Sequence, residues 1–144
     1  MMEIKPENII IPHAPPFIFV DSIVNINSRS IICNKRIERE DQYLVYKSGE
    51  KEYISQAALI ECVLQSGAYL MTATASATLQ NTEERKMYFI GSPEITFGAN
   101  PDIDDILNIE VEVIQKLRKM ARLQGKILCN SKLVLKGTFI VAEK

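Results

Sequence analysis

A single acidic side chain, Glu61, interrupts the apolar stretch QAALIECVLQSGAYL that runs from Gln56 to Leu70. The stretch predicts a buried helix, and a carboxyl group in such surroundings needs a specific purpose. Gln65 follows four residues later and therefore shares a helix face with Glu61. The two polar groups could meet a ligand or each other. A carboxyl group in an apolar setting tends to keep its proton, which suits a general acid.

A complete proton-transfer site would usually pair this acid with a histidine. The only histidine, His13, lies in a proline-rich segment near the N-terminus, and we expect a structural role for it. Cys62 is adjacent to Glu61 but has no histidine close in sequence, so a nucleophilic role is not expected. The cysteines are Cys33, Cys62 and Cys129, an odd and widely spaced set without a CxxC pair. We therefore predict buried thiols, with neither a disulfide framework nor a metal site.

The composition of the chain fits one globular domain covering residues 1–144, because 47% of the residues are hydrophobic and no linker-like block interrupts them. A net charge of -1 with interspersed acids and bases argues against nucleic-acid binding. The N-terminal apolar run at Ile9–Ile11 is too short for a signal peptide or membrane span. We expect a cytoplasmic protein without a bound cofactor, since a reducing compartment suits unpaired cysteines.

One long helix is expected to follow two strands and precede four more. Ser55 is a plausible N-cap, and the helix is predicted to end near residue 79. Small residues along it, including Gly67, would permit close packing against a sheet. Residues 38–54 are expected to be polar and irregular. The predicted strands cover residues 17–24, 30–37, 86–97, 105–116, 118–129 and 132–142.

The C-terminal strands show the alternation that a half-buried sheet requires. The apolar members of the second of them are Leu107, Ile109, Val111 and Val113. Asn130-Ser131 predicts a tight hairpin, and short connections require antiparallel neighbours. The predicted fold is therefore α+β, with a curved antiparallel sheet of about six strands wrapped around one long central helix. Because its edges remain open, a dimer that joins two sheets edge to edge is expected.

The order of these elements, together with three motifs, resembles the hot-dog fold family of 3-hydroxyacyl-acyl-carrier-protein dehydratases. IPHAPPFIFVDSI at residues 11–23 has the family's order of Pro-His, Pro-Phe and Val-Asp. ALIECVLQSGA at residues 58–68 resembles the family's helix motif, in which a glutamate is followed four residues later by glutamine and then by small residues. Phe89-Ile90-Gly91 and Phe97 resemble the strand that follows the helix.

The resemblance implies that Glu61 and Gln65 are the catalytic pair of the helix motif. It also implies that Tyr43, Gly91 and Phe97 contact the acyl substrate. For Phe97, packing in the core is the alternative. For Glu61, the alternative is a structural link with Gln65 at a dimer interface. The implied substrate is a 3-hydroxyacyl or enoyl thioester of acyl carrier protein or coenzyme A.

At one position the sequence differs from the motif of the active family members. Active members carry a histidine in a His-Phe-Pro-Gly context on the loop before the helix, and this histidine works with the glutamate of the partner subunit. Here Lys47 stands at that position, in Tyr46-Lys47-Ser48-Gly49. The loop resembles that of dehydratase-like proteins from pigment and polyene biosynthesis clusters, some of which lack the usual pair and can associate with another subunit. Lys47 is expected to be a solvated loop residue, because neutral lysine at pH 7 needs a pKa lowered by about three units.

Three functions follow from the residues and the resemblance. The first is a dehydratase-like protein of fatty-acid or polyene-type biosynthesis, with weak or absent catalysis because the histidine is missing. The second is a non-catalytic hot-dog subunit that binds an acyl chain or completes a heterodimer. The third is an acyl thioesterase. Whether the protein is an enzyme therefore depends on which residue of a second subunit faces Glu61. That subunit could be another copy of this chain, in a homodimer, or a different chain, in a heterodimer.

Overall fold

A computed structural model describes residues 19–39, 45–48, 51–78 and 87–143. The elements are β1 (Ser22–Ile26), β2 (Ser30–Arg36), β3 (Val45–Ser48), β4 (Lys51–Ile54), α1 (Gln56–Thr78), β5 (Met87–Phe97), β6 (Ile106–Leu117), β7 (Met120–Cys129) and β8 (Lys132–Glu143).

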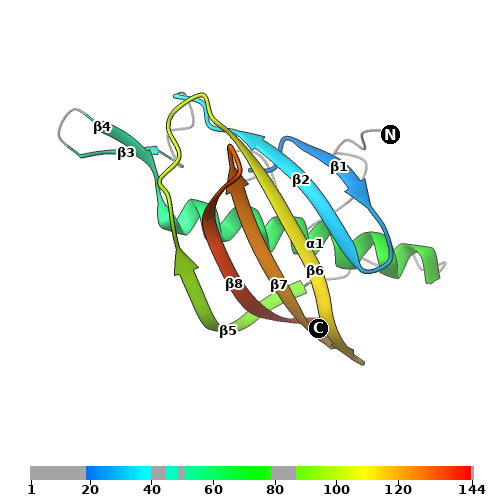
Figure 1. Ribbon diagram of the computed structural model, residues 1–144. Coiled ribbons are helices and arrows are strands. Elements are labelled where there is room, and N and C mark those ends of the chain that lie inside the picture. The colour runs from blue at the N-terminus through cyan, green and yellow to red at the C-terminus, as the bar shows by residue number, and fades with distance from the viewer. Residues whose placement is uncertain (1–18, 40–44, 49–50, 79–86, 144) are drawn as a thin grey trace.

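The long strands form one antiparallel sheet of six strands in the order β1-β2-β6-β7-β8-β5. Figure 1 shows α1 lying across one face of this curved sheet. The predicted hot-dog architecture is therefore confirmed. Within the described residues, no helix is both long and apolar enough to span a membrane.

A second, two-stranded sheet pairs β3 with β4 beside the start of α1 (Figure 1). The expectation of an irregular segment over residues 38–54 is wrong for these two strands. Each has only four residues. Runs that short give too few positions for an alternating pattern to be recognised in the sequence.

Local signals in the sequence account for the ends of several elements. The Ser55 hydroxyl accepts a hydrogen bond from the Ala58 N–H at 3.0 Å, which confirms Ser55 as the N-cap of α1. Asn130 and Ser131 have φ angles of 52° and 66°. Two consecutive residues with positive φ are typical of the tight turns that join adjacent antiparallel strands, here β7 and β8.

The helix approaches the sheet closely because small residues face it. A β-carbon placed on Gly125 in β7 would lie 2.3 Å from the Cγ1 atom of Val63 in α1. One placed on Gly67 in α1 would lie 2.8 Å from the Cδ1 atom of Leu123. The predicted close contact between helix and sheet is confirmed, and it fixes the height of α1 above β7.

Gly125→Ala should therefore destabilise the fold by about 1–3 kcal/mol, the usual penalty for overpacking a core. Chemical denaturation measures the change, and Gln124→Ala on the same strand should stay within about 0.5 kcal/mol of the wild type. Val63→Ala should recover part of the loss when combined with Gly125→Ala, because it removes the opposing methyl groups. Equal stabilities for Gly125→Ala and the wild type would contradict this packing.

Candidate active site

Glu61 and Gln65 lie one turn apart on α1 and their side chains meet. Gln65 is fully buried, whereas Glu61 is partly exposed. The Gln65 amide nitrogen Nε2 donates a long hydrogen bond of 3.4 Å to Glu61 Oε1. The structure thus brings together the two residues that the helix motif singled out, and their catalytic role remains a prediction.

The orientation of the Gln65 amide is set by the backbone of a distant segment. The Phe19 N–H donates to Gln65 Oε1 at 2.8 Å, and both groups are buried. A backbone N–H can only donate, so the oxygen of the amide must face Phe19. The NH₂ group is consequently directed toward the Glu61 carboxyl group. Gln65 therefore connects the segment before β1 to the acid of the helix.

A charged pair formed by Lys35 of β2 and Asp21, which precedes β1, was not identified from the sequence. The Lys35 ammonium group is 3.4 Å from Asp21 Oδ1, and only 6% of the Lys35 side chain is exposed. Its position could have been noticed, because Lys35 continues the inward-facing series of Ile31 and Cys33 along β2. A cation among inward-facing residues is uncommon in a strand with one buried face.

The cysteines have the buried positions predicted for them. Cys33, Cys62 and Cys129 are all buried, unpaired thiols. Burial raises the pKa of Cys62 to about 12, with Lys35 opposing the rise and Glu61 adding to it. Burial also raises the pKa of Cys33 to about 11. Both thiols stay protonated near neutral pH, which supports packing rather than nucleophilic roles.

The remaining predicted site residues are distributed more widely. Phe97 lies in β5, is partly buried and packs against the core. Gly91 pairs with Ile140 of β8, where the register of β5 is irregular on both sides. Lys47 lies in β3 opposite Glu52 of β4, so the expectation that it belongs to a loop is wrong. Tyr43 and His13 fall outside the described residues.

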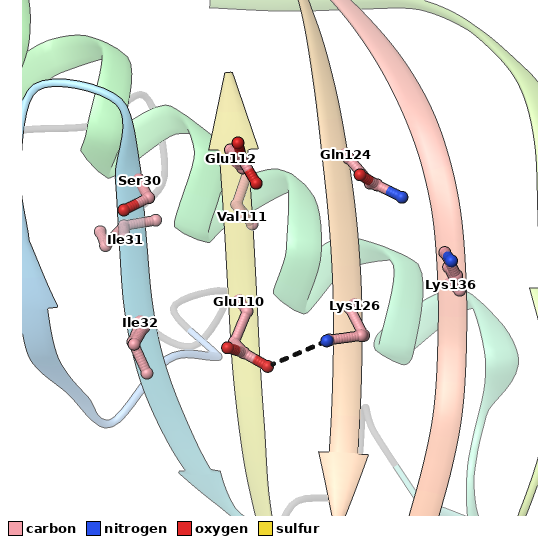
Figure 2. Close-up of a pocket in the computed structure, with 9 residues that line it drawn as sticks. All are labelled: Ser30, Ile31, Ile32, Glu110, Val111, Glu112, Gln124, Lys126 and Lys136. Carbon is pink, nitrogen blue, oxygen red and sulfur yellow. Dashed lines mark ion pairs between the residues drawn. The ribbon is translucent and has the colours of Figure 1, made fainter. Parts of the chain in front are cut away.

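The outer face of the sheet carries a shallow hollow of about 400 Å³. Figure 2 shows Glu110, Glu112, Gln124 and Lys126 in front of the strands, with α1 behind the sheet. Glu110 and Lys126 are opposite one another across β6 and β7, and their charged groups are 3.7 Å apart. The sheet separates this hollow from α1, so it is not part of the Glu61 site.

Gln65→Leu should lower the free energy of unfolding by about 1–3 kcal/mol, because it leaves the buried Phe19 N–H without its acceptor. Denaturant titration measures the loss. Gln56→Leu makes the same chemical change at an exposed position on the same helix and should have little effect. Equal losses in the two variants would contradict the role given to the Phe19 contact.

Comparison with known sequences identifies similarity to dehydratases. The family model of ApeP-like dehydratases matches residues 5–144. The 3-hydroxyacyl-[acyl-carrier-protein] dehydratase FabZ of Anoxybacillus flavithermus is 25% identical over 151 aligned residues, covering 100% of both chains. FabZ of Clostridium perfringens is 26% identical over 144 residues, covering 93% of this chain and 97% of the relative.

Solved structures share the fold at lower sequence identity. The dehydratase heterocomplex ApeI:P from Xenorhabdus doucetiae gives a TM-score of 0.81 at 13% identity, covering 93% of this chain and 88% of the matched chain. A hypothetical thioesterase from Streptococcus pneumoniae with coenzyme A gives 0.67 at 14% identity, covering 85% and 84%. These two likenesses show the hot-dog fold alone. The match of the family model over nearly the whole sequence places the chain in the ApeP-like dehydratase family.

Proposed function

We propose that this protein is the glutamate-bearing subunit of a hot-dog dehydratase and that a different hot-dog subunit supplies the histidine. The observation that carries the proposal is the Glu61–Gln65 contact on α1, in a chain whose only histidine is His13. In this proposal Glu61 is one half of an acid/base pair, and its contact with Gln65 supports its position on α1. Lys47 stands where the family histidine is expected.

The proposed reaction is the syn elimination of water from a 3-hydroxyacyl thioester. The partner's histidine removes the proton on the carbon next to the thioester. Glu61 donates a proton to the 3-hydroxyl as the C–O bond breaks, so the products are a 2-enoyl thioester and water. Each general acid or base typically contributes about 10²–10⁴-fold in rate. A glutamate without the histidine would therefore be a slow catalyst.

Lys47 is a poor substitute for the missing base. A lysine must lose its proton before it can accept one, and the unperturbed pKa near ~10.4 makes this cost about 4–5 kcal/mol at pH 7. The adjoining sequence Ser48-Gly49-Glu50-Lys51 is polar, which does not favour the neutral amine. The high cost of a neutral Lys47 favours a base from another chain.

A heteromeric assembly also agrees with a known relative of the same fold. The structural neighbour ApeI:P is a dehydratase heterocomplex. Among the described residues, β1 and β5 are the edge strands of the sheet, and an edge strand can pair with a second sheet. We infer that this protein forms a mixed dimer in which Glu61 faces the partner's histidine.

The test is turnover of a 3-hydroxyacyl thioester by the protein alone, by a candidate histidine-bearing hot-dog subunit alone, and by the two together. The mixture should be at least about 100-fold faster than this protein alone, and Glu61→Gln should remove that gain. Glu112→Gln, at an exposed position on the outer face of β6, is the matched control and should retain activity.

Full activity of the isolated homodimer would contradict the proposal, and so would a mixture that remains active with Glu61→Gln. Free thiol should not appear during the reaction. Its release, without formation of the enoyl product, would indicate the thioesterase alternative instead.

The residues at the end of the β6–β7 hairpin favour a substrate that is bound to a carrier protein. Residues 113–124 contain four basic residues and no acidic ones. Ile114, Leu117 and Met120 are large apolar side chains exposed by 44%, 59% and 43%. Beside them is a small hollow of about 100 Å³. Apolar side chains among cations suit docking of an acidic protein surface, and we propose that acyl carrier protein binds here.

Changing Arg118 and Lys119 to glutamate should raise the KM for a carrier-borne substrate about tenfold or more, with the loss reduced at high salt. The KM for a short thioester lacking the carrier should not change. Changing Lys132 and Lys136 to glutamate, at exposed positions on β8, makes the same change in net charge and should leave both values unchanged. Equal effects on both substrates would exclude a docking role for this hairpin.

A further inference from the structure

Lys35 occupies a buried position, where an ammonium group needs a partner of opposite charge. It lies on the inward-facing side of β2 and is 5% exposed. Its neighbour across the ladder is Leu107 of β6, which is fully buried. An ammonium group is retained in such surroundings only when it is paired, and Asp21 Oδ1 lies 3.4 Å away.

Asp21 is in turn fixed to β2 through its backbone and its second carboxyl oxygen. Asp21 Oδ2 accepts the Arg36 N–H at 2.6 Å. The Asp21 N–H donates to the Asn34 carbonyl oxygen at 2.9 Å. The carboxyl group therefore connects the start of β1 to the backbone of β2 as well as to the Lys35 ammonium group.

Two residues before Asp21, Phe19 donates its N–H to Gln65. Consecutive Cα atoms are about 3.8 Å apart, so two residues leave little freedom between these anchor points. A displacement of Asp21 must move Phe19. Movement of the Phe19 N–H would change its hydrogen bond to Gln65 Oε1, which orients the Gln65 amide. The NH₂ group of the same amide contacts Glu61.

We propose that the Asp21–Lys35 ion pair positions Glu61, acting through Phe19 and Gln65. The pair does not touch the substrate in this account. It holds the segment before β1 so that the Gln65 NH₂ group faces the Glu61 carboxyl group. The consequence for catalysis rests on the proposed dehydratase function, whereas the consequence for Gln65 does not.

The first test observes Gln65 directly, in the isolated protein. The side-chain NH₂ signals of Gln65 are assigned in a ¹H–¹⁵N spectrum by their loss in Gln65→Leu. Lys35→Met keeps an apolar stem and removes the charge, and it should shift these signals and speed their exchange with solvent about tenfold or more. Asp21→Asn should act in the same direction, and it provides the test if Lys35→Met fails to fold.

The matched control is the neighbouring ion pair between Arg36 and Asp104, whose charged groups are 3.6 Å apart and largely exposed. Asp104→Asn should leave the Gln65 signals unchanged. Asn also tolerates the positive φ of 75° at this position. Unchanged Gln65 signals in folded Lys35→Met or Asp21→Asn would overturn the proposal.

The second test uses the active complex with the partner subunit. Lys35→Met should lower kcat about tenfold with little change in KM, and it should cause no further loss when combined with Glu61→Gln. Lys35→Arg, which keeps the charge, should restore most of kcat. Losses that multiply in the double variant would show that Lys35 does not act through Glu61. If no complex turns over the thioester, the proposed function fails, and the Gln65 spectrum still decides the positioning role.

Discussion

The close contact between α1 and the sheet is the constraint on which the rest of the structure depends. Gly125 and Gly67 let the helix backbone approach β7 so closely that no further methyl group fits between them. At that distance Gln65 is shielded from water and its polar atoms must find partners within the protein. They find the Phe19 N–H and the Glu61 carboxyl group. Helix packing thus determines where the acid lies.

In the proposed function, this arrangement provides one half of an acid/base site. Glu61 is held by a buried amide, whereas the position expected to carry the base holds Lys47. The neighbouring Cys62 thiol is protonated near neutral pH and fully buried, so it does not replace the histidine. The proposed function therefore assigns the base to a second subunit.

Structural features that depend on a short stretch of sequence could be predicted, because their causes are local. The alternation of Leu107 to Val113 gave the buried face of β6, and the Ser55 cap marked the start of α1. The contact between Phe19 and Gln65 joins residues 46 positions apart and has no local pattern. The pairing of Lys35 with Asp21 depends on the register of the β1–β2 ladder, in which Ser22 lies opposite Asn34 and an irregularity follows Ile23. Neither contact can be read from the types of neighbouring residues.

The most direct measurement is a structure of this protein in complex with a histidine-bearing hot-dog subunit. We expect a mixed dimer in which an imidazole of the partner faces the Glu61 carboxyl group across the interface, with space for a thioester between them. A complex in which Glu61 faces a second copy of its own chain, with no imidazole near it, would contradict the proposed function.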